Sequence, residues 1–341
     1  MNTAAASTRT MLLGAMCLLP ACSVGPDYVR PDSPAPAAFK ELQGWQPAQP
    51  QDQLGRGPWW KMFGDPLLDE LEQQVEISNL NVAIASAQFR AAKALVQQTR
   101  AGRLPTVTAD ASVDRSRGPV GTGNRVIGSA NQATSYSAAL DASWELDVWG
   151  RVRRSVEANE AGAQASAADL ESARLSAQAT LAGDFWLLRA VDAQKQLLDD
   201  TVTAYQRSLQ MVTNRNVQGV ASKGEVVQAQ TQLESVRAQA LDLGVQRAQL
   251  EHAIAVLIGK PPAELTIVPA PLGTKVPQVP VGLPSQLLER RPDVAAAERR
   301  VAAASARIGV AAAAFYPALT LSGSAGYRST DLTHWITAPA R

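Results

Sequence analysis

The sequence predicts an α+β membrane protein that combines long antiparallel coiled-coil helices with transmembrane β-strands. Three observations carry this prediction. Residues 136–146 alternate apolar and polar side chains with a period of two, which is typical of a strand with two different faces. Residues 151–214 and 223–258 contain good helix formers and no proline, which predicts two very long helices. A short apolar stretch near the N-terminus has the features of a secretory signal.

Composition argues against several classes of function. Charged residues make up 18% of the 341 residues and the net charge is +1, so no basic field is available for nucleic acid. Both cysteines, Cys17 and Cys22, lie near the N-terminus and leave the remainder without a disulfide framework. His252 and His334 are isolated, and the sequence shows no nucleotide-binding loop, nucleophile triad or metal cluster. We therefore expect no enzyme, no cofactor and no nucleic-acid partner.

Residues 1–21 are predicted to be a signal peptide. One positive charge precedes the apolar stretch at 11–19, which is shorter than the ~20 residues that a membrane-spanning helix needs. Residues 19–22, Leu-Pro-Ala-Cys, resemble a lipoprotein box, so Cys22 is the predicted site of lipidation, for example by palmitate. The alternative is a plain signal peptide with an incidental cysteine. Ser23 after the cysteine resembles a lipoprotein sorted to the outer membrane.

Residues 22–65 are expected to form an extended, lipid-anchored N-terminal segment, because most of this stretch is rich in Pro, Gln and Ala and lacks periodicity. Asp65 and Pro66 mark a helix start, with a capping carboxylate before a proline at the first helical position. An Ala-rich helix is expected over 66–104, and Pro105 ends it.

A transmembrane β-hairpin is expected over 105–149. The alternation begins at 106–114, is interrupted by a Gly-rich loop at about 116–133, and returns over 136–146. The side chains of the second strand expected to face the membrane are Tyr136, Leu140, Trp144 and Leu146. The alternative is a soluble hairpin with its polar face in water. The signal peptide and the long loop favour the membrane, because a soluble hairpin seldom has so long a connection.

A long periplasmic helical hairpin is expected over 150–258. Its first helix, of ~64 residues, would span about 95 Å at ~1.5 Å per residue. The sequence Gly-Val-Ala-Ser at 219–222 breaks the helix, and the second helix stops before the equatorial linker region at 259–290. At the start of the hairpin, Arg151, Arg153 and Arg154 lie beside a tryptophan, which favours cationic and aromatic anchoring at the membrane interface. The alternative is a substrate site.

An internal repeat relates residues 82–112 to residues 294–324, with an offset of 212 (294 minus 82). Both copies pass from an Ala-rich helix through a proline into an alternating strand. The helix of the second repeat is expected over 291–316, and the start of a second β-hairpin over 317–341. Because the second copy has no returning strand and no long helical hairpin, we expect the chain to be C-terminally truncated.

Six motifs together resemble the outer-membrane factor family, the TolC-like channels of tripartite pumps, in its lipoprotein drug-efflux branch. They are Cys-Ser-Val-Gly-Pro-Asp-Tyr at 22–28, Trp-Trp-Lys-Met-Phe-Gly-Asp-Pro at 59–66, Ser-Trp-Glu-Leu-Asp-Val-Trp-Gly-Arg at 143–151, Gly-Val-Ala-Ser at 219–222, Leu-Pro-Ser-Gln-Leu-Leu-Glu-Arg-Arg-Pro-Asp at 283–293 and Phe-Tyr-Pro at 315–317. They are collinear and cover almost the whole chain.

The resemblance implies a homotrimer in which each protomer lends four strands to one 12-stranded barrel. It also implies a periplasmic adaptor (membrane fusion) protein, an inner-membrane pump and outer-membrane lipid as partners. Gly219, Val220 and Ser222 are similar to a family tip motif that contacts the adaptor, and the alternative is an ordinary helix break. With only three strands of four in the sequence, we expect the 341-residue product not to form a working channel.

The expected function is that of an outer-membrane channel subunit of a tripartite efflux pump, a passive exit duct for drugs or other small solutes linked to antibiotic resistance. The protein would be lipid-anchored in the outer membrane and extend into the periplasm. One alternative is an outer-membrane duct for type I protein secretion. Another is a periplasmic coiled-coil lipoprotein without a barrel.

Overall fold

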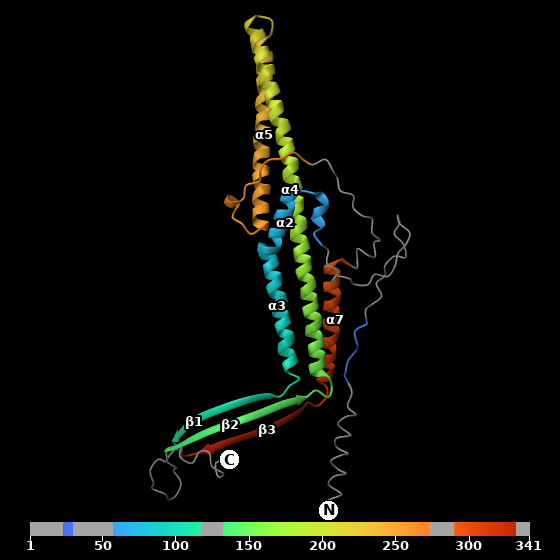
Figure 1. Ribbon diagram of the computed structural model, residues 1–341, viewed down its shortest axis with the longest axis vertical. Helices are drawn as coiled ribbons and strands as arrows, with labels where there is room; N and C mark the ends of the chain where they lie inside the picture. Colours follow the sequence, from blue (N-terminus) through green and yellow to red (C-terminus); the bar gives the residue numbers. More distant parts are fainter. Residues whose placement is uncertain (1–22, 30–56, 118–131, 273–289, 332–341) are drawn as a thin grey trace, which may run out of the picture. The chain divides into compact units, whose positions relative to one another are not determined.

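The computed structural model describes residues 23–29, 57–117, 132–272 and 290–331 (Figure 1). The elements in chain order are η1 (Trp59–Phe63), α2 (Pro66–Ser78), α3 (Leu80–Ala101), β1 (Thr106–Arg117), β2 (Gln132–Leu146), α4 (Arg151–Val217), α5 (Lys223–Leu257), η2 (Pro262–Glu264), α7 (Pro292–Ala313) and β3 (Leu319–Ser329). Within the described residues, no helix combines the length and the hydropathy that crossing a bilayer requires.

The chain divides into two compact units. The first comprises Met1–Ser33, Ala91–Gln164 and Glu298–Arg341, and it holds the sheet together with the helix ends that adjoin it. The second comprises Pro34–Arg90 and Ala165–Ala297, and it holds α2, α5 and most of α4.

The sheet of the first unit is antiparallel throughout, with the strand order β1-β2-β3 (Figure 1). The β1–β2 ladder extends from Thr106 opposite Ser143 to Arg117 opposite Gln132. Both strands are therefore longer than the expected 106–114 and 136–146, and the connection between them is shorter than the expected loop at about 116–133. Polar side chains near the loop do not prevent pairing, because the ladder is formed by backbone groups.

The core of the second unit forms where α2 packs against α4 and α5. Leu181, Phe185 and Leu188 of α4 are fully buried, and their spacing of four and three residues places them on one helix face. The other buried members of this cluster are Trp60, Leu68, Leu71, Val75, Val82, Ala177, Ala182, Ile254, Ile258 and Ile267. Asp65 begins α2 as expected of a cap, since its carboxylate accepts hydrogen bonds from Leu67 N at 2.9 Å and from Leu68 N at 3.1 Å.

The helix expected over 66–104 is divided by Asn79 into α2 and α3, which corrects the prediction of one continuous helix. The Asn79 backbone is extended, and its side-chain oxygen caps α3 by accepting from Asn81 N at 3.0 Å and Val82 N at 3.1 Å. Its side-chain nitrogen donates to the Leu257 carbonyl at 2.7 Å. The break is therefore stabilised by a contact with the end of α5, which lies 178 residues away in the sequence.

Candidate functional site

The three strands carry their apolar side chains on one face of the sheet, because directly opposed residues of antiparallel strands share a face. In the middle of this apolar face, Leu140 lies between Ala109 and Ala325. The other apolar side chains of the face are Val107, Ala111, Val113, Tyr136, Ala138, Ala142, Trp144, Leu146, Leu319, Leu321 and Tyr327.

The apolar face is open. Val113 is 66% exposed, Leu140 is 56% exposed and Leu321 is 61% exposed. A contiguous apolar surface of this kind marks a site of contact with a membrane or with another protein. An ordinary soluble hairpin covers one apolar face with its own core, and among the described residues nothing covers this one.

The opposite face is polar. Its side chains include Thr106, Thr108, Asp110, Ser112, Asp114, Ser135, Ser137, Asp141, Ser143, Glu145, Thr320, Ser322, Ser324 and Arg328. The hydroxyl oxygens of Ser112 and Ser137 are 2.8 Å apart across β1 and β2. One sheet therefore presents a surface that suits hydrocarbon and a surface that suits water.

The four residues expected to face the membrane all lie on the apolar face. Leu140 is exposed, while Tyr136, Trp144 and Leu146 are half-buried among their neighbours. The Trp144 indole donates to the Arg103 carbonyl at 3.1 Å, so its polar end is satisfied at the end of the sheet where β1 begins. That these side chains contact lipid stays a prediction.

Polar and aromatic contacts stabilise the junction between the end of β2 and the start of α4. Asp147 accepts hydrogen bonds from the backbone N–H groups of Val152 and Arg153, both at 2.8 Å, and so satisfies donors at the start of α4. The ring of Trp149 stacks on Tyr316 with 4.7 Å between centroids. The Trp149 indole also donates to a carbonyl of the α7–β3 connection at 2.9 Å.

The three neighbouring arginines do not form one interfacial group. Arg151 pairs with Glu145 at 2.6 Å, and Arg153 pairs with Asp147 at 3.4 Å. The Arg154 side chain is only 6% exposed. The expectation of a shared interfacial role is therefore wrong for Arg154, because the helix turns this side chain into the protein while its two neighbours remain at the surface.

The turn between α4 and α5 is built by standard helix-ending chemistry. Gly219 has a φ of 76°, in the left-handed region that favours glycine, and Val220 N donates to the Arg215 carbonyl at 2.9 Å. Ser222 and Glu225 form a reciprocal capping box, with Glu225 N to Ser222 Oγ at 3.3 Å and Ser222 N to Glu225 Oε2 at 2.6 Å. The hydrogen bond from the Ser222 backbone holds the pKa of Glu225 below its ordinary value.

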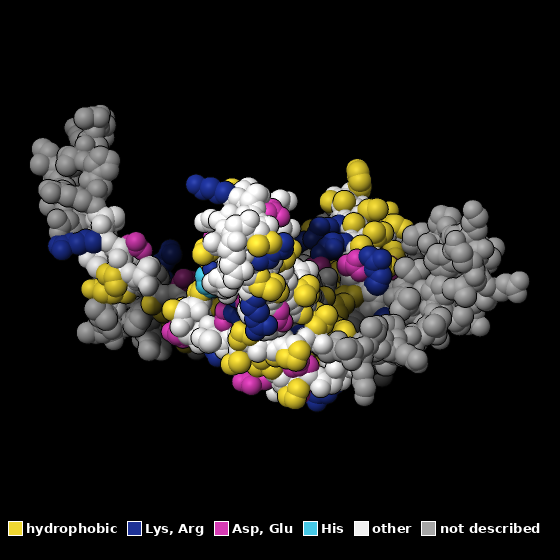
Figure 2. Space-filling model, turned by 90° about the horizontal axis from the view of Figure 1, so that it is seen from above, with side chains coloured by type: hydrophobic (Ala, Val, Ile, Leu, Met, Phe, Trp, Pro, Cys, Tyr) yellow, Lys and Arg dark blue, Asp and Glu magenta, His cyan; other side chains and the backbone are white. Residues whose placement is uncertain are grey.

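Of the three residues expected to contact an adaptor, two are explained by the structure of the turn: Gly219 by its left-handed backbone and Ser222 by its capping hydrogen bond. It does not account for Val220, which is 65% exposed. Val217, the last residue of α4, is also exposed, at 82%, and no motif in the sequence singles it out. Figure 2 views the molecule from the hairpin end and shows hydrophobic side chains among charged ones on the exposed surface.

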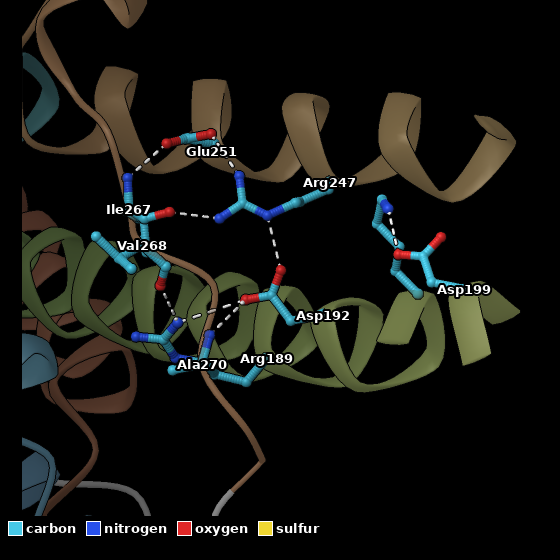
Figure 3. Close-up of polar contacts among 9 residues, drawn as sticks. Arg189, Asp192, Asp199, Arg247, Glu251, Ile267, Val268 and Ala270 are labelled. Atoms are coloured by element: carbon cyan, nitrogen blue, oxygen red, sulfur yellow. Dashed lines mark hydrogen bonds and ion pairs between the residues drawn. The ribbon is translucent and has the colours of Figure 1, made fainter. Parts of the chain in front are cut away.

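A buried ionic network joins α4 and α5 in the second unit (Figure 3). The Arg247 guanidinium donates to Asp192 Oδ1 at 2.7 Å and to Glu251 Oε2 at 2.9 Å. The Asp192 side chain is 3% exposed, and those of Arg247 and Glu251 are 15% exposed. Because these side chains are largely removed from water, each charge needs its partner to offset the cost of desolvation.

The same network holds the backbone that follows η2. Arg247 also donates to the Ile267 carbonyl, and Ile267 N donates to Glu251 Oε1 at 2.6 Å (Figure 3). Arg189 donates to the Val268 carbonyl at 2.8 Å. Backbone and side-chain groups thus satisfy one another, which indicates a structural role for the network and not a binding or catalytic one.

Several predicted features lie outside the described residues. They are the signal peptide at 1–21, the lipidation site Cys22, residues 30–56 of the expected N-terminal segment, residues 273–289 of the expected equatorial linker and His334. His252 is exposed on α5. Over the ranges that the structure describes, no group of three or more His, Cys, Asp or Glu side chains is placed to hold a metal ion.

Comparison with known sequences identifies relatives. The family model described as outer membrane efflux protein matches residues 71–260 and 283–338. The probable efflux pump outer membrane protein TtgC of Pseudomonas putida is 33% identical over 323 residues, which cover 93% of this chain and 66% of TtgC. The solvent efflux pump outer membrane protein SrpC of Pseudomonas putida is 33% identical over 331 residues, covering 95% of this chain and 69% of SrpC.

The pyoverdine export outer membrane protein OpmQ of Pseudomonas aeruginosa shows 31% identity over 317 residues, covering 92% of this chain and 66% of OpmQ. The chain therefore spans slightly less than two thirds of the length of TtgC and of OpmQ.

Solved structures show the same fold. The outer-membrane channel OprN superposes with a TM-score of 0.79 at 32% identity, covering 94% of this chain and 71% of OprN. The CmeC outer membrane channel of Campylobacter jejuni superposes with a TM-score of 0.80 at 22% identity, covering 94% of this chain and 68% of CmeC. The predicted fold class, long helices combined with the strands of a TolC-like channel, is confirmed by these similarities.

Proposed function

This chain belongs to the outer membrane efflux protein family, and on that premise we propose that it is an outer-membrane channel subunit of a tripartite efflux pump. Within an assembled channel it would contribute to a passive exit duct for drugs or other small solutes. The observation that carries the proposal is the sheet, in which one open face is apolar from Val107 to Val113 of β1 and along the paired parts of β2 and β3, while the opposite face is mostly polar. Such a sheet can separate hydrocarbon from a watery lumen.

The class of solute follows from the relatives. TtgC and SrpC are named for efflux pumps, SrpC for solvent efflux and OpmQ for pyoverdine export. These names favour small solutes over secreted proteins as cargo. The exposed apolar face argues against a periplasmic coiled-coil lipoprotein without a barrel, because such a protein would have no use for it.

The proposed partners are two further copies of the chain in a homotrimer, a periplasmic adaptor protein and an inner-membrane pump. Among the described strands, β1 and β3 each have one edge without a neighbouring strand. This supports assembly, since a strand edge in lipid leaves backbone groups unpaired at several kcal/mol each. The exposed Val217 and Val220 support adaptor contact, because no requirement of the turn explains them. The energy for transport would come from the pump.

Outer-membrane lipid is proposed as a partner in two ways. The apolar face of the sheet would contact acyl chains, and Cys22 would carry chains of its own. Each buried CH₂ of an attached acyl chain contributes ~0.8 kcal/mol to membrane binding, so several chains anchor a protein stably. The stacked pair of Trp149 and Tyr316 next to the sheet is of the kind that proteins place at membrane interfaces.

The test uses a matched pair of arginine substitutions on the two faces of β2. Leu140→Arg puts a charge on the apolar face, at a cost of about 2–4 kcal/mol if the side chain meets the middle of a bilayer. Ser143→Arg puts the same charge on the polar face, where Asp141 and Glu145 are its neighbours on the same strand. Each variant is refolded with phospholipid vesicles in a Cys22→Ala background, so that no lipid anchor contributes.

The measurements are flotation with the vesicles and heat-modifiable mobility in electrophoresis. We expect Leu140→Arg to lose both, and Ser143→Arg to keep both at the level of the parent. Equal insertion of the two variants would show that the apolar face does not meet lipid, and the channel proposal would then fail.

A further inference from the structure

The N-terminal segment (residues 23–29) is bound closely to the rest of the first unit. Val24 N donates to the Trp149 carbonyl at 3.1 Å, directly at the junction of β2 and α4. Gly150 is buried beside Ser23, and a Cβ at Gly150 would lie 3.0 Å from the Ser23 Cα. The backbone at Ser23 is therefore held against the position where the sheet meets the helices.

Arg154 holds the middle of the same segment. Its guanidinium donates to Asp27 Oδ1 at 2.6 Å and to the Gly25 carbonyl at 3.3 Å, and on the other side to Glu157 Oε2 at 2.8 Å. The Arg154 side chain is 6% exposed, whereas the Asp27 side chain is 88% exposed. The N-terminal segment thus supplies a counter-charge to an arginine that would otherwise be buried with only one partner.

Glycine makes this approach possible at two further points. A Cβ on Gly309 of α7 would lie 2.9 Å from Arg154 Cγ and 3.0 Å from the Val24 carbonyl oxygen. A Cβ on Gly25 would collide with the Gly309 Cα, and Gly25 has a φ of 103°, where other residues are strained. The segment therefore lies against both α4 and α7, at a distance too short for a Cβ atom at Gly25 or Gly309.

We propose that Arg154 is a positioning residue that fastens the N-terminal segment across α4 and α7 and so holds the start of the lipid-anchored chain at the strand–helix junction. The inference rests on the proposed lipid anchor at Cys22, one residue before Ser23. With the segment fastened, acyl chains on that residue enter the membrane level with the end of the sheet. The anchor and the apolar face are thereby tied to the same depth.

The fastening also links the two copies of the internal repeat. Arg154 lies on α4, which follows the first strand pair, and Gly309 lies on α7, the helix of the second copy. The N-terminal segment contacts both helices, through Asp27 to Arg154 and through Val24 and Gly25 to Gly309. Substitution of Arg154 should therefore release the N-terminal segment while α4 and α7 stay folded.

The experiment measures the position of the segment on α7 with two nitroxide labels. The substitutions Val29→Cys and Val301→Cys place the labels at side chains that are 81% and 52% exposed, so labelling does not disturb a core. The full chain, expressed in a Gram-negative host and purified in detergent, is analysed by double electron–electron resonance. We expect one narrow distance distribution in this doubly labelled parent.

Three variants test the fastening and one serves as the control. Arg154→Met removes the charge but keeps an apolar stem, Asp27→Asn removes the exposed counter-charge, and Gly309→Ala adds the colliding Cβ. We expect all three to lose the narrow distance. Gly162→Ala, also in the α4 part of the first unit, has no atom within 4 Å of the added Cβ and should keep it.

The proposal is overturned if Arg154→Met and Asp27→Asn both keep the narrow distance with unchanged helical circular dichroism. If Arg154→Met fails to fold, Asp27→Asn decides alone, because an exposed side chain does not support the core. The mass of the labelled parent tests the lipid anchor separately. Acylated Cys22 takes no label, whereas a free thiol adds one, so the anchor can fail while the fastening stands.

Discussion

Glu72 of α2 is completely buried, and neither of its carboxylate oxygens has a hydrogen-bond partner among the described residues. Burial raises the pKa of Glu72 from its ordinary 4.5 to about 8. The carboxyl group is therefore protonated in the folded protein at neutral pH. An acidic residue on the buried face of an amphipathic helix cannot be identified as neutral from sequence, because only its packing partners determine its desolvation.

The shift predicts how stability depends on pH. Between pH 4.5 and about 8 the folded state keeps a proton that the unfolded state has lost, so stability is full below this window and falls as the pH rises through it. The slope is at most about 1.4 kcal/mol per pH unit. Glu72→Gln should remove this decline, measured as the urea midpoint of the helical signal at several pH values. Glu70→Gln, an exposed position of the same helix, should retain it.

The buried network around Arg247 predicts a large effect of one substitution. Arg247→Met leaves Asp192 and Glu251 buried without their shared partner, and breaking such a pair costs about 3–5 kcal/mol. The control is Lys195→Met, which removes an exposed ion pair with Asp199 at 2.7 Å, worth at most ~0.5 kcal/mol. Denaturant unfolding of both variants measures the difference. Similar losses in the two would show that the network is not stabilised by burial.

At the scale of the element, the sheet is more specific than an alternation of apolar and polar residues. Gly326 of β3 lies opposite Ala139, and a Cβ at Gly326 would lie 2.6 Å from the Ala138 carbonyl oxygen. Gly323 on the same strand has no atom within 4 Å of an added Cβ. Gly326 thus allows β3 to approach β2 closely, whereas packing shows no reason for a glycine at position 323.

Gly326→Ala should therefore push β3 away from β2 and destabilise the sheet by about 1–3 kcal/mol, the usual cost of overpacking. Gly323→Ala should be neutral or slightly stabilising, because alanine restricts the unfolded chain. The fraction of chain with heat-modifiable mobility after refolding into vesicles measures both. A loss of that fraction in Gly323→Ala alone would contradict the register of β2 and β3.

At the scale of the whole molecule, the two copies of the internal repeat differ in burial. Val82 and Val96 of α3 are 5% and 7% exposed, whereas their equivalents on α7, Val294 and Ile308, are 39% and 57% exposed. Val82 belongs to the cluster formed with α4 and α5. Among the described residues, no helix covers Val294 or Ile308 to the same extent.

Identical substitutions at the repeated positions should therefore have unequal effects. Val82→Ala removes buried methyl groups and should cost about 2 kcal/mol. Val294→Ala acts at a partly exposed position and should cost less than ~0.5 kcal/mol in this chain. The urea midpoints of the two variants measure the contrast. Equal losses would mean that α7 is as well packed as α3.

Local sequence patterns alone determined much of this protein. The period of two in 136–146, the long proline-free stretches and the helix start at Asp65 each depend on neighbouring residues, so the fold class could be predicted from them. The tip residues Gly219 and Ser222 were recognisable for the same reason, since caps and turns are formed within a few residues.

Only the tertiary structure decided the features that depend on distant partners. The helix break at Asn79 is stabilised by the Leu257 carbonyl, and the Arg154 guanidinium pairs with Asp27, at sequence separations of 178 and 127 residues. The neutral form of Glu72 likewise depends on the helices that surround it. Periodicity shows which face of an element is apolar, but desolvation and pairing depend on which other element packs against that face.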